Sequence, residues 1–141
     1  FMKAGESVQI DGPMGHFTVR DDSSPIVMLA GGVGITPIRG ILDSIKTETS
    51  RPVKLIYSAK GYYLFGDEIK DWIAQNPSFE GHFIEDGREG IKMVSEFAKE
   101  YGNGAYYYTS GAPAMISSVE SNYKELGIEA SRLISDTFTG Y

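Results

Sequence analysis

No cysteine occurs among the 141 residues of the chain. The chain therefore forms no disulfide of its own, and it lacks the thiolates that hold many zinc ions and iron–sulfur clusters. Its two histidines, His16 and His82, are too far apart in sequence for a metal-binding motif. We expect no metal site here.

Positive charge and long apolar runs are also scarce. Thirteen Lys and Arg stand against nineteen Asp and Glu, giving a net charge of −6, which argues against a nucleic-acid partner. The apolar runs are far shorter than the roughly 20 residues of a membrane-spanning helix, and no secretory leader is visible. We expect a cytoplasmic protein without a membrane span.

The composition, 41% hydrophobic and 23% charged, is typical of a globular domain with a core. From Ile26 onward, apolar runs alternate with amphipathic segments, which is typical of a parallel sheet covered by helices. The predicted strands are Ile26–Ala30, Val53–Ser58, His82–Glu85, Ala105–Thr109 and Arg132–Ser135. The predicted helices are Thr36–Lys46, Asp67–Gln75, Met93–Tyr101 and Pro113–Leu126. We predict a three-layer α/β domain over residues 25–141, with a doubly wound five-stranded parallel sheet whose order reverses beside the first strand.

A glycine-rich loop, Gly31-Gly32-Val33-Gly34-Ile35-Thr36-Pro37, joins the first strand to the first helix. Glycines let the backbone approach phosphates closely, and a helix start offers unpaired N–H groups with a positive dipole end. We expect Thr36 to cap the helix and Pro37 to occupy its first position. The loop predicts a dinucleotide pyrophosphate site, although Pro37 stands where the common fingerprint has a small residue. An ordinary strand-to-helix turn is the alternative.

Two more polar loops follow strands at the same edge of the predicted sheet, Ser58-Ala59-Lys60 and Ser110-Gly111-Ala112-Pro113. Ligands of doubly wound sheets bind at this edge. Lys60 slightly favours NADPH, since a cation there can hold the 2′-phosphate; a solvated loop lysine fits equally well. Arg88 is either a second phosphate contact or a surface residue in a turn.

Aromatic and acidic residues follow the second strand. Tyr62, Tyr63 and Phe65 either stack on an adenine or cover the sheet edge. Asp67 and Glu68 suit the first turn of a helix, where the dipole favours acidic residues, and we assign them no catalytic role.

Residues 1–24 contain strand and turn patterns without a helix. Short strands are predicted at Ser7–Ile10 and His16–Arg20, on either side of Gly12-Pro13-Met14-Gly15. Two strands are not stable alone, so they either pack on the α/β domain or end a larger β domain. We favour the second interpretation.

Four motifs follow one another along the chain: Gly12-Pro13-Met14-Gly15-His16-Phe17, the glycine loop, Ser110-Gly111-Ala112-Pro113-Ala114-Met115, and Phe138-Thr139-Gly140-Tyr141. In sequence and in order they resemble the ferredoxin–NADP reductase superfamily, over nearly the whole chain. Its members join a flavin-binding β-barrel to an NAD(P)-binding α/β domain, and pass a hydride from NAD(P)H to FAD or FMN and electrons onward to an acceptor. The resemblance implies an NAD(P)H-dependent flavoprotein reductase, with residues 1–24 as the end of the barrel.

The resemblance also assigns roles to residues. It places the glycine loop against the pyrophosphate and close to the flavin, and Ser110, Gly111, Ala112, Pro113 and Met115 beside the nicotinamide. Ser58 and Lys60 would bind the adenosine part. Phe138 or Tyr141 would shield the flavin ring, and Asp136 would supply the acidic side chain that is often found near the terminus in this superfamily.

The chain departs from the superfamily pattern in two ways. Ser110 replaces a cysteine and lacks its polarizable sulfur, and the barrel motif Arg-x-Tyr-Ser/Thr that holds the flavin is absent. We therefore do not expect the chain to retain flavin tightly by itself; the barrel would be in cis or on a partner subunit. The alternative function is a non-catalytic regulatory or assembly subunit that keeps the nucleotide-binding fold.

Overall fold

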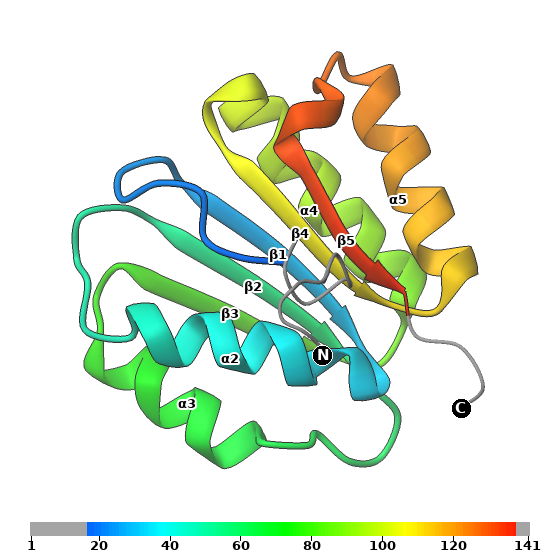
Figure 1. Ribbon diagram of the computed structural model, residues 1–141. Coiled ribbons are helices and arrows are strands. Elements are labelled where there is room, and N and C mark those ends of the chain that lie inside the picture. Colours follow the sequence, from blue (N-terminus) through cyan, green and yellow to red (C-terminus); the bar gives the residue numbers. More distant parts are fainter. Residues whose placement is uncertain (1–16, 138–141) are drawn as a thin grey trace, which may run out of the picture.

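The computed structural model describes residues 17–137, which form a three-layer α/β domain (Figure 1). Five parallel strands pair in the order β3-β2-β1-β4-β5, so the order reverses beside β1. The strands are β1 Ile26–Gly31, β2 Val53–Ser58, β3 Phe79–Ile84, β4 Tyr106–Gly111 and β5 Leu133–Thr137. The helices are α2 Ile35–Ile45, α3 Gly66–Gln75, α4 Gly87–Tyr101 and α5 Pro113–Glu125, with short 3-10 turns η1 Gly32–Gly34, η2 Gly102–Gly104 and η3 Ala130–Arg132. The predicted fold class is confirmed.

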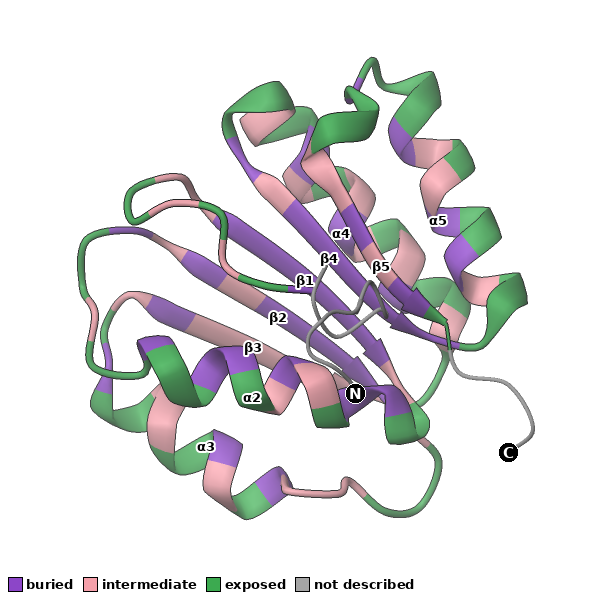
Figure 2. Cartoon of the chain, in the orientation of Figure 1, coloured by how far each residue is buried: buried purple, intermediate pink, exposed green. Residues whose placement is uncertain are grey.

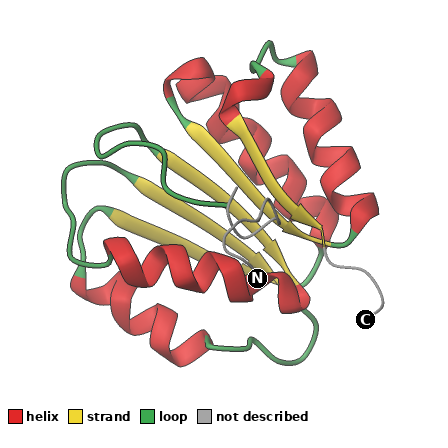
Figure 3. Cartoon of the chain, in the orientation of Figure 1, coloured by secondary structure: helices red, strands yellow, loops and turns green. Residues whose placement is uncertain are grey.

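The core lies on both faces of the sheet. Val27, Met28 and Leu29 of the central strand β1 are fully buried, and burying each such side chain contributes about 1.5–3 kcal/mol. Helices α2 and α3 cover one face and α4 and α5 the other, as right-handed crossovers from a central strand require (Figures 1 and 3). Buried residues accordingly concentrate in the strands and on the helix sides that face them (Figure 2).

Two elements, β3 and α4, begin several residues earlier than predicted. Strand β3 starts at Phe79 rather than His82. The prediction misses its first residues because Gly81 weakens the strand pattern in the sequence. In the structure, the absence of a side chain at Gly81 makes room for Ile73 of α3. Helix α4 starts at Gly87 rather than Met93. Its glycines obscure the helical pattern, but Asp86 caps it by accepting a hydrogen bond of 2.9 Å from the Arg88 amide.

The segment of residues 17–25 leads into β1. The prediction of a strand over His16–Arg20 is wrong for its described part, residues 17–20, which are irregular. Phe17 and Val19 instead pack into the core on the α2 side of the sheet. The predicted strand Ser7–Ile10, the turn Gly12–Gly15 and His16 lie outside the described residues.

Residues 17–137 contain neither a membrane-spanning helix nor a cluster of metal ligands. No helix in this range combines the length and apolar character needed to cross a bilayer. Nor does the range contain three or more metal-ligating side chains grouped closely enough to hold an ion.

Candidate functional site

The three predicted loops meet at the carboxyl edge of the sheet. Gly31 at the end of β1 lies beside Ser58 of β2, and Ala30 lies beside Ser110 of β4. The arrowheads of all five strands point to this edge (Figure 1). The sheet therefore brings together loops that are far apart in the sequence.

The glycine loop continues directly into α2. Gly32–Gly34 form the turn η1, and the Ile35 amide donates to the carbonyl groups of Gly32 and Val33. Because this turn closes the helix start by backbone bonds, α2 begins at Ile35 without a side-chain cap. The prediction that Thr36 caps the helix is therefore wrong, and Pro37 is the third helical residue rather than the first. No acidic side chain occupies the first turn, so the positive end of the helix dipole can favour an anion there.

Two glycines of the loop are required by geometry. Gly32 has a φ of +55°, in the left-handed region that favours glycine. A Cβ at Gly34 would overlap the carbonyl group of Ser110 and lie 2.8 Å from the Gly111 amide nitrogen. The glycine loop is thus in direct backbone contact with the last two residues of β4, Ser110 and Gly111, and the missing side chain of Gly34 makes this contact possible.

Met115 of α5 lies over the ends of β1 and β4. A Cβ at Gly31 would come within 2.9 Å of its sulfur, and a Cβ at Gly111 within 2.7 Å of its terminal methyl group. Ala112 precedes α5 and Pro113 opens it, so a second helix start lies at this edge. Val33, 42% exposed, is on the outer side of the loop.

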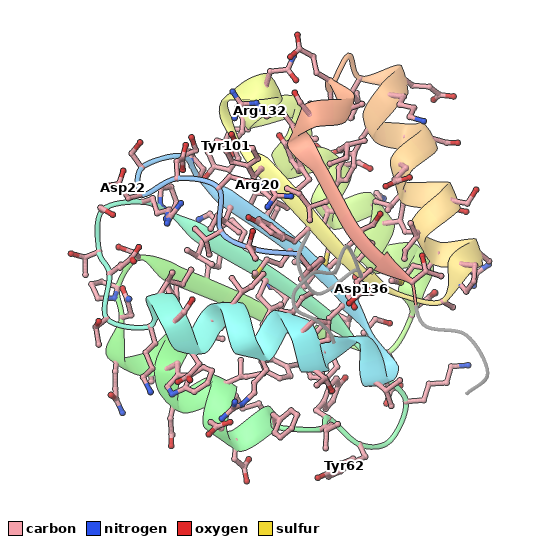
Figure 4. All side chains as sticks on the ribbon, in the orientation of Figure 1. Arg20, Asp22, Tyr62, Tyr101, Arg132 and Asp136 are labelled. Atoms are coloured by element: carbon pink, nitrogen blue, oxygen red, sulfur yellow. The ribbon has the colours of Figure 1, made fainter. Side chains whose placement is uncertain are left out.

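Ser110 is fully buried, and its hydroxyl has no hydrogen-bond partner among the described residues. Its neighbour in register on β5 is Asp136, also buried, at the carboxyl end of that strand (Figure 4). A buried unpaired hydroxyl costs about 1–3 kcal/mol. The Ser110 hydroxyl is thus an unsatisfied buried polar group at this edge of the sheet.

An open pocket of about 660 Å³ lies between this edge and the starts of α4 and α5. Its charged residues are Lys60, after β2, and Glu85, Asp86 and Arg88, after β3; its wall includes Met115. Lys60 and Met115 both line this cavity, whereas no residue of the glycine loop or of the predicted loop Ser110–Pro113 does. The sequence analysis does not single out Glu85, although its place directly after a strand of this edge is a usable signal.

Asp86 and Arg88 form a local pair. Besides the amide bond at the helix cap, the Asp86 carboxylate accepts two bonds of 3.4 Å from the Arg88 guanidinium. The amide bond first, and then the guanidinium, lower the pKa of Asp86. Arg88 lies in a helix rather than a turn, and it lines the pocket while held by a carboxylate.

The aromatic residues after β2 have different surroundings. Tyr63 covers the sheet edge: its ring packs edge-on against Tyr57 and Phe83, and its hydroxyl donates to the Ile84 carbonyl at 2.7 Å. Phe65 packs against the core beneath the Arg39 guanidinium. The edge-covering interpretation therefore holds for Tyr63, whereas Phe65 packs against α2 and Tyr62 is 71% exposed (Figure 4). Ser58 is buried at the end of β2, facing Gly87.

A second hollow, of about 510 Å³, lies on the opposite face, beside α2. Its lining residues come from residues 17–19, the start and middle of α2, and the end of β5: Phe17, Thr18, Val19, Thr36, Pro37, Gly40, Ile41, Ser44 and Asp136. We call it the α2 groove. The glycine loop therefore has a charged pocket on one side and a mainly apolar groove on the other. Phe138 and Tyr141 lie outside the described residues.

Solved structures share this architecture. A flavohemoglobin from Malassezia yamatoensis with bound FAD and heme matches with a TM-score of 0.70 and 18% identity, over 84% of this chain and 32% of its own. A cytochrome P450 reductase from Amycolatopsis matches with a TM-score of 0.68 and 23% identity, over 85% of this chain and 39% of its own. The ferredoxin reductase of carbazole 1,9a-dioxygenase matches with a TM-score of 0.68 and 18% identity, over 87% and 40%. The chain shares the ferredoxin reductase-like α/β fold of these structures.

Relatives of the chain in sequence are components of the Na(+)-translocating NADH-quinone reductase. The component from Haemophilus influenzae is 29% identical over 99% of the chain, and the one from Pseudomonas aeruginosa is 26% identical over the same share. The chain spans 38% and 39% of their lengths. No family model matches the chain.

Proposed function

We propose that this domain is the NAD(P)H-binding part of a flavin-dependent reductase. The observation that carries the proposal is the meeting of the glycine loop, which leads directly into α2, with the end of β4, where the buried Ser110 hydroxyl has no partner among the described residues. The relatives support it, since they are components of an NADH-quinone reductase and a structural neighbour binds FAD.

Each part of the edge has a role in this proposal. Gly32, Gly34 and the first turn of α2 hold the pyrophosphate, and the Ser110 hydroxyl orients the nicotinamide. Bound NAD(P)H supplies the hydride, while the domain contributes position and exclusion of water. Met115, which already covers the ends of β1 and β4, closes the nicotinamide side from solvent.

The charged pocket would hold the adenosine half. Lys60 alone favours NADPH, but the structure adds two carboxylates to the same pocket, and Asp86 already holds Arg88. A carboxylate suits the ribose hydroxyls of NADH, whereas it repels a 2′-phosphate. Together with the names of the relatives, this favours NADH as the donor.

The flavin would approach from the α2 groove, where Thr36, Pro37 and Asp136 meet. Gly40 supports this, because an exposed glycine inside a helix costs about 1 kcal/mol relative to alanine and no described residue lies within 4 Å of the place that its Cβ would take. A close approach by another part of the protein would explain it. In this proposal residues 1–24 end the flavin-binding barrel, in cis or completed by a partner subunit, residues 25–141 bind NAD(P)H, and Phe138 or Tyr141 shields the flavin.

We also propose a cytoplasmic location, where nicotinamide nucleotides are available. The test is anaerobic flavin reduction, at cytoplasmic pH and salt, in the protein that carries both the flavin-binding barrel and this domain. NADH should bleach the flavin absorbance, and Gly34→Asp should abolish the reaction because it places a side chain and a negative charge in the pyrophosphate site. Nucleotide binding without any flavin reduction would instead support a non-catalytic subunit. The terminal acceptor is a separate question from this half-reaction.

A further inference from the structure

The segment of residues 17–25 is held to the domain at both of its ends. In Figure 1 it crosses the sheet on the α2 side and then loops around the amino ends of the strands into β1. Whatever precedes Phe17 is joined to the NAD(P)H-binding domain through this segment. Its anchoring therefore decides how firmly the two parts are connected.

Tyr108 anchors the first end. Its hydroxyl donates a 2.7 Å hydrogen bond to the Thr18 carbonyl, and the Phe17 ring packs edge-on against its ring at 5.4 Å. Tyr108 is fully buried on β4, and burial raises its pKa to about 12, so the hydroxyl remains a donor at neutral pH.

Arg51 anchors the second end from just before β2, at the sheet edge opposite the glycine loop. One guanidinium nitrogen donates to the Asp21 carboxylate at 3.2 Å and to the Ser24 carbonyl at 3.3 Å, and the other to Glu48 at 3.3 Å. A neighbouring side chain, Ser50, donates to the Asp22 carbonyl at 2.9 Å.

Asp21 organises the bend that Arg51 holds. Its carboxylate accepts bonds from the amides of Ser23 and Ser24 and a 2.6 Å bond from the Ser24 hydroxyl. Burial acts to raise the pKa of Asp21, but these bonds and the Arg51 charge outweigh it, and the pKa lies below its ordinary value. The bend is thus a charged, hydrogen-bonded unit at neutral pH.

A contribution to folding stability does not by itself explain why an arginine is buried at position 51. The side chain is only 3% exposed, yet its Nε has no partner among the described residues. A buried ion pair often contributes little stability compared with apolar residues, because both charges lose their hydration. Holding one defined geometry is the property that a forked guanidinium supplies better than an apolar side chain.

We propose that Arg51 and Tyr108 are positioning residues that fix the segment joining the flavin-binding part to this domain. The inference rests on the proposed function, since hydride transfer requires the donor and acceptor atoms to be held about 3–3.5 Å apart, and a misplacement of about 1 Å can cost on the order of 10²-fold in rate. Arg51 acts at a distance from the nucleotide site, so its loss should affect hydride transfer without affecting nucleotide binding.

The experiment compares Arg51→Met and Tyr108→Phe with the wild type in the flavin-loaded protein. Tyr108→Phe removes a single oxygen and keeps the Phe17 contact, so it tests the idea even if Arg51→Met folds poorly. Arg39→Met is the matched control, because Arg39 makes a bidentate pair with Glu68 that involves only α2 and α3. Amide hydrogen exchange over residues 18–24, the limiting rate of flavin reduction and the nucleotide Kd are measured for each.

We expect both variants to exchange faster over residues 18–24 and to lose about tenfold or more in the limiting rate, with the nucleotide Kd nearly unchanged. Arg39→Met should change neither exchange in this segment nor rate. Unchanged exchange, or faster exchange with a wild-type rate, would overturn the inference, as would an equal loss in Arg39→Met. A wild type that NADH and NADPH both fail to reduce would overturn the proposed function itself, which is a different result.

Discussion

The backbone of Gly34 lies directly against the carbonyl group of Ser110, so that the glycine loop contacts the carboxyl end of β4. The pyrophosphate site and the nicotinamide site of the proposed reductase are therefore coupled through backbone contact.

Gly34→Ala should destabilise the domain by about 1–3 kcal/mol, because the added methyl group must displace backbone rather than a flexible side chain. Gly40→Ala is the matched control. Among residues 17–137, nothing lies within 4 Å of a Cβ at Gly40, so alanine there should stabilise α2 by about 0.4–1 kcal/mol. Urea unfolding measures both, and equal effects of the two substitutions would contradict the close approach at Gly34.

Ser110→Ala separates stability from chemistry. Removing a buried hydroxyl without a partner should leave the free energy of unfolding unchanged or slightly higher. The same substitution should slow flavin reduction more than it weakens nucleotide binding, because the hydroxyl orients the nicotinamide rather than the pyrophosphate. Stopped-flow reduction and equilibrium titration give the two quantities, and equal losses would limit Ser110 to binding.

The charged pocket makes a prediction about nucleotide choice. Glu85→Gln should weaken the binding of NADH by up to about tenfold, which corresponds to about 1.4 kcal/mol, and should strengthen the binding of NADPH. Lys60→Ala should weaken the binding of NADPH more than that of NADH. Competition binding at fixed ionic strength measures the ratio, and a ratio that neither substitution moves would place the adenosine elsewhere.

The edge strand β3 carries a pH-dependent ion pair. Glu80 accepts a 2.8 Å bond from Lys54 of β2 and a 2.7 Å bond from His82. The Lys54 bond first, and then the His82 bond, lower the pKa of Glu80 from its ordinary 4.5. A lowered carboxyl pKa stabilises the folded state above the unfolded value, and this contribution is lost as the pH falls through the folded value.

Glu80→Gln should therefore lower the free energy of unfolding at pH 6–7 and have progressively less effect below about pH 4.5. The Glu80 side chain is 44% exposed, so solvent screening keeps the effect small. Urea unfolding across this pH range measures the difference, and a difference that grows on acidification would have the wrong sign.

The sequence predicts the sheet and the glycine loop well because their signals are local. The buried run of β1 and the glycines that follow it identify the strand, the turn and the helix without any distant contact. The start of α4 is harder, because Gly90 is selected by its close approach to Leu29 and Ile84, which lie on other elements. Helix propensity cannot show such a contact.

The details of the site depend on distant contacts in the same way. The sequence indicates that Ser110 lies near the glycine loop, but only packing reveals that its hydroxyl is buried without a partner among the described residues. Met115 is likewise placed by two glycines on different strands. The capping role predicted for Thr36 is wrong because a 3-10 turn, rather than a side chain, closes the start of α2.

Calorimetric titration of the protein with NADH and NADPH, beside the Gly34→Asp variant, tests the central claim most directly. The account predicts saturable binding to the wild type, tighter for NADH, and its loss in a variant that remains folded by circular dichroism. Binding that survives in Gly34→Asp, or a folded wild type that binds neither nucleotide, would contradict the assignment of the glycine loop as the pyrophosphate site.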